Sequence, residues 1–188
     1  MRETSAKIVR LGIVGVGLMG SGHARSILES RVPGCHLAAL CDANPEAGAA
    51  FAGVPRFTSA AQMFKSGLID AVLVATPHYD HTTVGIAALR AGFHVLVEKP
   101  VSVHKADALK LLAAHRDPRQ VFAAMFNQRT DPRYQTLRRM VKGGQFGAIR
   151  RVNWIITDWF RPQAYYKHAG GRATWAGEGG GVLLNQCP

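Results

Sequence analysis

A glycine-rich segment at residues 15–20, Gly-Val-Gly-Leu-Met-Gly, restricts the fold of this 188-residue chain more than any other feature of its sequence. An apolar run at residues 7–14 with the character of a strand precedes it, and a helix-like stretch follows it. A strand, a GxGxxG turn and a helix together indicate a phosphate-binding unit. In such a unit Gly15 permits the tight turn, Gly17 lets the backbone approach a pyrophosphate, and Gly20 allows the helix to pack closely on the strand. A turn that merely needs flexible residues is the alternative.

Asp42 follows a second expected strand, at residues 37–41, and lies 22 residues after Gly20. This spacing is close to the ~20 residues that separate the turn from the ribose-binding acid in dinucleotide-binding proteins. A carboxylate there accepts hydrogen bonds from the ribose hydroxyls and repels a 2′-phosphate, and residues 43–45 contain no arginine to hold such a phosphate. We therefore expect NAD rather than NADP as the cofactor. The alternative for Asp42 is a helix cap.

The chain alternates apolar runs with helix-like stretches as far as residue 126. Further strands are expected at residues 56–58, 70–75, 93–97 and 120–126. Helices are expected to begin at Asn44-Pro45-Glu46 and to cover residues 60–65, 80–90 and 104–115. Strands that alternate with helices form a parallel sheet covered on both faces. The sequence therefore predicts an α/β fold with a doubly wound parallel sheet of Rossmann type, whose ligands bind at the carboxyl ends of the strands.

The pattern changes after Phe126. Residues 132–142 have helical character, and residues 150–160 have the composition of a strand. Residues 170–181 contain six glycines and no clear periodicity, and a new apolar element begins at residue 182. We expect residues 1–126 to form an NAD-binding domain and residues 127–188 to be the start of an incomplete α+β domain.

Composition and charge exclude several classes of protein. A hydrophobic content of 47% is typical of globular chains, and the apolar run around the glycines is too short to cross a membrane. Residues 127–188 carry 10 Lys/Arg against 3 Asp/Glu, but these form no basic run, so we expect no nucleic-acid partner. Cys35, Cys41 and Cys187 share no pairing or zinc-ligand pattern, which indicates reduced thiols and a cytoplasmic location.

Several more motifs occur in order along the chain. They are Ala75-Thr76-Pro77 with His81, Glu98-Lys99-Pro100, Asn127-Gln128-Arg129, and the Gly-Gly-Gly-Val-Leu-Leu-Asn-Gln-Cys-Pro segment at residues 179–188. Together with the glycine-rich turn and Asp42, they resemble the glucose–fructose oxidoreductase, inositol dehydrogenase and MocA (Gfo/Idh/MocA) family of NAD(P)-dependent oxidoreductases. The resemblance covers nearly the whole chain, and the Glu-Lys-Pro motif is its most diagnostic element. Because members of this family are considerably longer, the chain resembles an N-terminal fragment of a protein that forms homo-oligomers.

The resemblance implies that Lys99 and Asn185 take part in catalysis. A lysine at the carboxyl end of a central strand can donate to a substrate oxygen and stabilise developing negative charge; an exposed lysine without a partner is the alternative. In the family an Asp-x-x-x-His motif supplies the other polar groups, and its histidine is the acid/base. Here Asn185 occupies the aspartate position and the histidine would fall one residue after Pro188. Asparagine orients a hydroxyl but takes up no proton at neutral pH.

The same resemblance assigns the remaining candidate residues. Cofactor contacts are implied for Gly15, Gly17, Leu18, Met19, Gly20, Asp42, Thr76, Pro77, His81, Glu98, Lys99 and Asn127. Substrate contacts are implied for Lys99, Arg129, Trp175 and Asn185. The alternatives are a packing role for His81, a salt bridge at the domain hinge for Arg129, and a core or interface position for Trp175. His78 and His81 have only Asp80 between them as a further ligand type and no cysteine nearby, so we expect no metal.

These observations predict an NAD-dependent oxidoreductase that transfers a hydride between nicotinamide and the CH–OH group of a sugar, a polyol or a related substrate. Two alternatives stay open. One is a glycosidase of the same family that uses NAD as a transient oxidant, and the other is a non-catalytic dinucleotide-binding protein. The 188-residue chain itself is expected to bind NAD and to be inactive.

Overall fold

The computed structural model describes residues 8–155, 157, 160–168 and 174–185. The chain divides into two compact units, which are described separately below. The first unit consists of residues 1–125 together with 174–188, and the second consists of residues 126–173. The boundary between a cofactor domain and a second domain expected after residue 126 stays a prediction.

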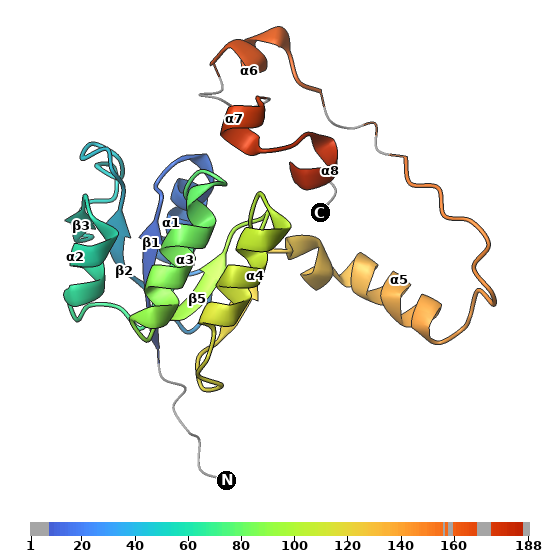
Figure 1. Ribbon diagram of the computed structural model, residues 1–188, viewed down its shortest axis with the longest axis horizontal. Helices are drawn as coiled ribbons and strands as arrows, with labels where there is room; N and C mark the ends of the chain where they lie inside the picture. The colour runs from blue at the N-terminus through green and yellow to red at the C-terminus, as the bar shows by residue number, and fades with distance from the viewer. Residues whose placement is uncertain (1–7, 156, 158–159, 169–173, 186–188) are drawn as a thin grey trace. The chain divides into compact units, whose positions relative to one another are not determined.

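A six-stranded parallel sheet forms the centre of the first unit (Figure 1). In sheet order its strands are β3 (Arg56–Phe57), β2 (Cys35–Cys41), β1 (Val9–Val14), β4 (Ala71–Val74), β5 (His94–Val97) and β6 (Phe122–Ala124). The chain starts in the middle with β1, runs outward to β3, and returns to the other side of β1 with β4. The predicted doubly wound fold of Rossmann type is therefore confirmed. Its topological switch point lies between β1 and β4, where such folds bind their ligands.

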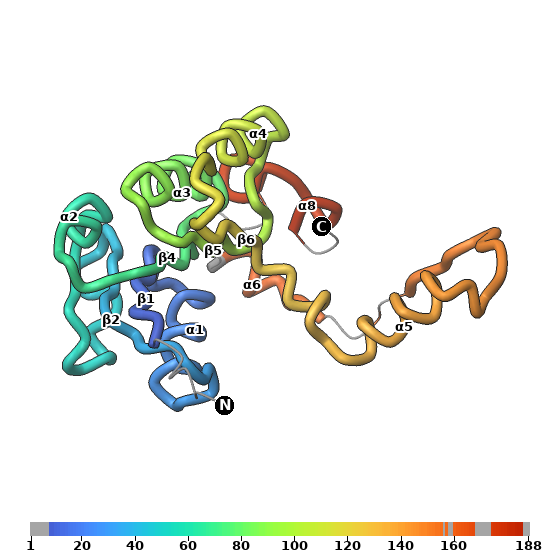
Figure 2. The backbone as a smooth tube through the Cα atoms, turned by 90° about the horizontal axis from the view of Figure 1, so that it is seen from below, coloured from blue at the N-terminus to red at the C-terminus, as the bar shows by residue number. Residues whose placement is uncertain are grey.

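Helices cover both faces of this sheet. Helix α1 (Leu18–Leu28) lies on one face, and α2 (Ala60–Lys65), α3 (Asp80–Arg90) and α4 (Lys105–Ala114) lie on the other, as Figure 2 shows. Two clusters of buried apolar side chains reflect this arrangement. The α1 face buries Ile13, Ala24, Ile27, Leu37, Leu40 and Leu73, whereas the opposite face buries Met63, Val72, Val74, Leu89, Val95, Val97 and Leu111. Burial on both faces explains why the central strands are apolar at nearly every position.

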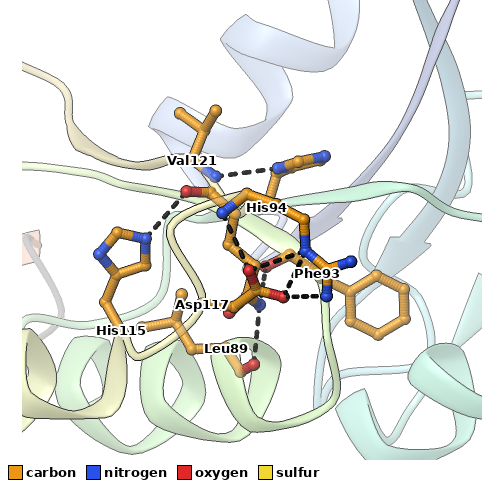
Figure 3. A network of polar contacts seen from close by, with 8 residues as sticks. Leu89, Phe93, His94, His115, Asp117 and Val121 are labelled. Carbon is orange, nitrogen blue, oxygen red and sulfur yellow. Dashed lines mark hydrogen bonds and ion pairs between the residues drawn. The ribbon is translucent and has the colours of Figure 1, made fainter.

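A polar network fixes the start of the edge strand β6 (Figure 3). The Gln120 amide Nε2 donates to the carbonyl oxygens of Leu89 and Phe93, both at 2.9 Å. The backbone N–H of Val121 donates to Nδ1 of His94 at 2.9 Å. The network lies at the amino ends of β5 and β6, so it stabilises the edge of the sheet opposite to the one where ligands are expected.

One element expected in the first unit is wrong. No helix begins at Asn44-Pro45-Glu46; the chain instead forms turns there. The Asn44 Oδ1 accepts from the backbone N–H of Glu46 at 3.0 Å, and Gly48 has a φ of +80°. A side chain that closes a local turn and a glycine in the left-handed region both interrupt a helix.

The second unit contains short helices. These are a 3₁₀ helix, η1 (Asn127–Thr130), and the helices α5 (Pro132–Lys142) and α6 (Gln163–His168). The helix predicted at residues 132–142 is confirmed, and Asp131 caps it by accepting from the backbone N–H of Arg133 at 2.9 Å. The described residues of the range 150–160 form no strand, because none of them pairs with another strand.

The C-terminal segment returns to the first unit. It carries α7 (Trp175–Glu178) and α8 (Val182–Asn185), each a single turn of helix. The side chain of Thr174 caps α7 by accepting from the backbone N–H of Gly177 at 3.0 Å. In the described part of the chain, no helix is long and apolar enough to cross a membrane.

Candidate active site

The glycine-rich turn joins β1 to α1, and two of its glycines are required by close packing. Gly15 has a φ of +93°, and a Cβ on it would lie 2.5 Å from the carbonyl carbon and oxygen of Ala75. A Cβ on Gly20 would overlap the carbonyl oxygen of Gly15. The turn can therefore follow this path only with glycine at these two positions.

The third glycine of the motif faces open space. A Cβ on Gly17 would have no heavy atom within 4 Å, and Gly17 is the N-cap residue of α1, with no side chain bonded to the helix start. The next two residues, Leu18 and Met19, leave 76% and 44% of their surface exposed. The first amides of a helix have no partner within the helix, and the helix dipole adds positive potential there. This uncapped, open end of α1 fits a pyrophosphate group.

Asp42 lies directly after β2 and holds the turn in place. Its Oδ2 accepts from the backbone N–H of Val16 at 2.7 Å, and its Oδ1 accepts from the backbone N–H of Asn44 at 2.9 Å. Each carboxylate oxygen has two lone pairs, so both retain capacity to accept from ribose hydroxyls. Asp42 also lines an open hollow of about 190 Å³, which begins where β2 and β3 end.

Thr76 follows β4 at the topological switch point. Its Oγ1 is buried and has no hydrogen-bond partner among the described residues. A buried hydroxyl without a partner is costly in a protein by itself, which marks this atom as a candidate contact for a bound molecule. Pro77, the next residue, is exposed. The cofactor roles predicted for both residues stay predictions.

His81, in the first turn of α3, is 1% exposed and faces inward. Its Nδ1 lies 2.7 Å from the carbonyl oxygen of Pro100 and its Nε2 lies 2.9 Å from that of Thr76. Burial lowers the pKa of His81, and these two backbone contacts oppose that effect. Through these contacts His81 ties the segment after β4 to the segment after β5. A direct contact between His81 and the cofactor stays a prediction.

Glu98 immediately follows β5 and is 4% exposed. Its Oε1 accepts from Nε2 of His23 in α1 at 2.7 Å, and its Oε2 accepts from the backbone N–H of Lys99 at 3.0 Å. His23 was not singled out by the sequence, because a lone histidine in a helix carries no spacing signal. The pair connects the helix that begins at the glycine-rich turn with the backbone of the candidate catalytic lysine.

The side chain of Lys99 contacts the C-terminal segment. Its Nζ donates to the Oδ1 of Asn185 at 2.6 Å and to the carbonyl oxygen of Asn185 at 2.8 Å. The Asn185 Nδ2 in turn donates to Oε1 of Glu178 at 2.6 Å. The two residues predicted to act in catalysis are thus in direct contact, although 86 positions separate them in the sequence. Glu178 is a further acidic group next to them.

Two side chains just before the start of α3 also contact the backbone of α7. The Tyr79 hydroxyl donates to the carbonyl oxygen of Trp175 at 3.0 Å, and Nδ1 of His78 lies 3.1 Å from the carbonyl oxygen of Glu178. The Trp175 side chain itself is 78% exposed. It is therefore not part of a core in the described structure, and its assignment to substrate stays a prediction.

Asn127 and Arg129 belong to the second unit, in the 3₁₀ helix η1. Both are exposed, and the Arg129 guanidinium lies over the ring of Phe126, 4.9 Å from its centroid. The cofactor contact expected of Asn127 and the substrate contact expected of Arg129 stay predictions.

Comparisons with known proteins agree with this geometry. A family model described as "Oxidoreductase family, NAD-binding Rossmann fold" matches residues 9–125. The inositol 2-dehydrogenase of Corynebacterium glutamicum is 32% identical over 149 residues, which make up 77% of this chain and 44% of that protein.

Solved structures extend the comparison. The WlbA dehydrogenase of Chromobacterium violaceum, in complex with NADH and UDP-GlcNAcA, is 32% identical with a TM-score of 0.86, over 98% of this chain and 53% of that one. The scyllo-inositol dehydrogenase of Lactobacillus casei, with bound NAD(H) and scyllo-inositol, is 28% identical with a TM-score of 0.67, over 75% of this chain and 43% of that one. The chain spans about half the length of these relatives. The family match confirms the NAD-binding Rossmann fold predicted from the glycine-rich turn. The chain therefore belongs to the Gfo/Idh/MocA oxidoreductase family with its NAD-binding Rossmann fold.

Proposed function

We propose that the protein to which this chain belongs is an NAD-dependent oxidoreductase that acts on a CH–OH group of a sugar or polyol. Three features of the first unit support a cofactor site: the open start of α1 after Gly17, the carboxylate of Asp42, and the unpartnered hydroxyl of Thr76. The start of α1 would hold the pyrophosphate and Asp42 the adenosine ribose. When bound, NAD supplies the hydride acceptor.

The contact between Lys99 and Asn185 is the observation that carries this proposal. It lies at the carboxyl end of β5, two strands along the sheet from the phosphate turn, a distance of roughly 10 Å at the usual strand spacing. The Lys99 ammonium would donate to the substrate oxygen and stabilise negative charge that develops on it. Asn185 would orient a neighbouring hydroxyl. Its amide takes up no proton, so it positions the substrate rather than acting as the acid/base.

Lys99 and Asn185 would exchange partners when a substrate binds. Without substrate, two oxygens of Asn185 accept hydrogen bonds from the Lys99 ammonium. A substrate oxygen would replace one of these two acceptors, because an ammonium nitrogen donates to any oxygen that takes the position of the Asn185 oxygen. The bond from Asn185 Nδ2 to Glu178 would keep the amide in its orientation during this exchange.

Within this substrate class, a specific observation favours a nucleotide-linked sugar over a free polyol. The match to the WlbA dehydrogenase, solved with UDP-GlcNAcA, covers 98% of this chain, whereas the match to the inositol dehydrogenase solved with scyllo-inositol covers 75%. Residues 127–188 also carry 10 Lys/Arg against 3 Asp/Glu, and a basic region attracts the anionic diphosphate of a sugar nucleotide.

The test is NADH formation by the complete protein with UDP-GlcNAcA, myo-inositol and scyllo-inositol, each with NAD. We expect turnover with at least one, and we expect Lys99→Met to reduce it by about a hundredfold or more, the usual scale for loss of one electrostatic stabiliser. The dissociation constant for NAD should change little, because the phosphate turn and Asp42 are unaltered. Full turnover by the Lys99→Met variant would refute the role of Lys99. Absence of turnover with all three substrates, despite NAD binding, would favour a binding protein.

A further inference from the structure

Arg56 and Asp42 line the same open hollow at the carboxyl end of the sheet. The lining residues are Leu40, Asp42, Asn44, Pro45, Ala47, Arg56, Phe57 and Thr58. In dinucleotide-binding folds the acid after the second strand binds the ribose that is joined to adenine. The hollow therefore belongs to the adenosine half of the cofactor site, and a cation shares it with the acid.

The pairing of β3 with β2 brings this arginine to the hollow. Arg56 is the first residue of β3 and pairs with Leu40, two positions before Asp42. Arg56 is exposed. Within the described part of the chain its side chain makes one hydrogen bond, from Nη1 to the carbonyl oxygen of Pro45 at 3.2 Å, and no ion pair. A guanidinium has five donors, so most of them are available to a ligand.

The two side chains have opposite effects on a 2′-phosphate. The Asp42 carboxylate repels such a group, whereas a guanidinium binds a phosphate through two parallel hydrogen bonds. The residues that follow Asp42 in the sequence contain no arginine, which favoured NAD on local grounds alone. The structure supplies the missing cation from a different strand.

We propose that Arg56 is a second cofactor-specificity residue, which gives the adenosine site a latent capacity for a 2′-phosphate. In the wild type the charge of Asp42 then selects NAD against the attraction of Arg56 for a 2′-phosphate, and neutralising that charge makes the site accept the 2′-phosphate through Arg56. This inference rests on the cofactor site of the proposed function. It predicts a coupling between the two residues that is specific for the phosphate at the 2′ position.

Adenosine 5′-monophosphate and adenosine 2′,5′-bisphosphate are suitable probes, because they differ only in the 2′-phosphate. Their dissociation constants are measured by calorimetry for the wild-type chain, Asp42→Asn, Arg56→Ala and the double variant. Asparagine keeps a side-chain oxygen that can still accept from the backbone N–H of Val16 or Asn44, so the turn retains part of its support. Arg119→Ala is the control, because Arg119 is exposed and pairs with Asp117, which lies beside Phe93 and His94 in Figure 3, at the amino end of β5.

We expect Asp42→Asn to tighten binding of the bisphosphate about fivefold or more and to weaken binding of the monophosphate. Adding Arg56→Ala to that variant should remove the gain for the bisphosphate and change the monophosphate by less than about twofold. Arg56→Lys should keep part of the gain, since an ammonium retains the charge without the bidentate geometry. Arg119→Ala should change neither ligand by more than about twofold.

Two results would overturn the inference while leaving the cofactor site intact. One is a bisphosphate affinity of the Asp42→Asn variant that does not depend on Arg56. The other is an Arg56→Ala variant that weakens both ligands equally, which would make Arg56 a support for the Pro45 turn or a contact to adenine. A wild-type chain that melts cooperatively but binds neither NAD nor the monophosphate would instead refute the cofactor site itself, and the inference with it.

Discussion

Three glycines lie at or near the start of α1. Replacing each with alanine separates the requirement for close packing from the requirement for open space at a ligand site. Gly20 and Gly22 lie inside α1, and Gly17 is its N-cap residue. A Cβ at Gly20 would overlap the carbonyl oxygen of Gly15 and lie 3.0 Å from its carbonyl carbon, whereas a Cβ at Gly17 or Gly22 would meet nothing within 4 Å. Replacing each with alanine therefore adds the same methyl group to three different environments.

The expected changes in stability follow from two opposing terms. Alanine stabilises a helix interior by about 0.8–1 kcal/mol relative to glycine. Gly22→Ala should gain most of that, since nothing opposes it. Gly20→Ala should lose about 1–3 kcal/mol net, because the clash is with backbone and because the N–H of Gly15 is itself bonded to the carbonyl oxygen of Cys41 at 2.8 Å. Gly17→Ala should lower the free energy of unfolding by only about 0.5 kcal/mol, because alanine is a poorer N-cap residue than glycine but meets no neighbouring atom.

NAD binding should follow a different order. Gly17→Ala places its methyl group in the open space where we expect the pyrophosphate, so its affinity for NAD should fall at least about tenfold with little change in melting temperature. Gly20→Ala should lose both stability and binding, and Gly22→Ala should keep its affinity.

Thermal unfolding and NAD titration of the same three proteins provide the measurement. For a chain of this size the melting temperature shifts by roughly 2–4 °C for each kcal/mol of change in the free energy of unfolding. If Gly17→Ala bound NAD as tightly as the wild type, the pyrophosphate would not lie at the start of α1. If Gly20→Ala were as stable as Gly22→Ala, the close packing of α1 against the turn would be wrong.

Three further predictions concern buried groups. Burial raises the pKa of the Cys41 thiol from 9.0 to about 11, so the folded state favours the neutral thiol. The contribution of Cys41 to the free energy of unfolding should therefore be constant below pH 9 and should fall by about 2–3 kcal/mol as the pH rises to about 11. Cys41 should also resist alkylation until the chain unfolds, and a pH series of urea melts with thiol labelling measures both effects. Thr76→Val removes a buried hydroxyl that has no partner among the described residues, so the free chain should be at least as stable as the wild type. The rise in melting temperature that NAD causes should become smaller, and an undiminished rise would exclude Thr76 from the cofactor site. His23→Ala removes the partner of Oε1 in the buried Glu98 side chain, so it should lower the free energy of unfolding by about 1–3 kcal/mol, and Glu98→Gln should restore part of that loss in the double variant. Strictly additive losses in urea melts would contradict the pair.

Most of the fold could be predicted from the sequence, because the patterns that locate helices and strands are local. Helix α3 was expected at residues 80–90 and is observed at Asp80–Arg90, and α5 was expected at 132–142 and is observed at Pro132–Lys142. Apolar runs, capping residues and terminating glycines act within a few positions, so periodicity is sufficient to locate such elements. The prediction of a helix after Asn44 was wrong, because an asparagine that can cap a helix can equally close a turn.

Strand pairing, in contrast to helix formation, depends on residues that are distant in the sequence. The range 150–160 has strand composition, but its described residues have no neighbouring strand and form none. A strand exists only through hydrogen bonds to a partner, which no local pattern supplies. Composition alone was therefore insufficient to predict whether residues 150–160 form a strand.

The candidate site shows the same division. The glycine-rich turn and Asp42 could be predicted from the sequence, because the geometry of the turn and the end of the strand favour those residue types, whereas Glu98-Lys99 was indicated by its resemblance to the family motif. The contact of His23 with Glu98, the contact of Lys99 with Asn185, and the presence of Arg56 beside Asp42 could not. Each joins residues on elements that are separated in the chain, and only the packing of helices and strands around the sheet brings such side chains within hydrogen-bond distance or into one hollow. The sequence by itself predicted which backbone segment binds a dinucleotide, because a glycine-rich turn is a local signal. The tertiary structure decided which side chains lie next to that segment, because they come from elements far apart in the chain.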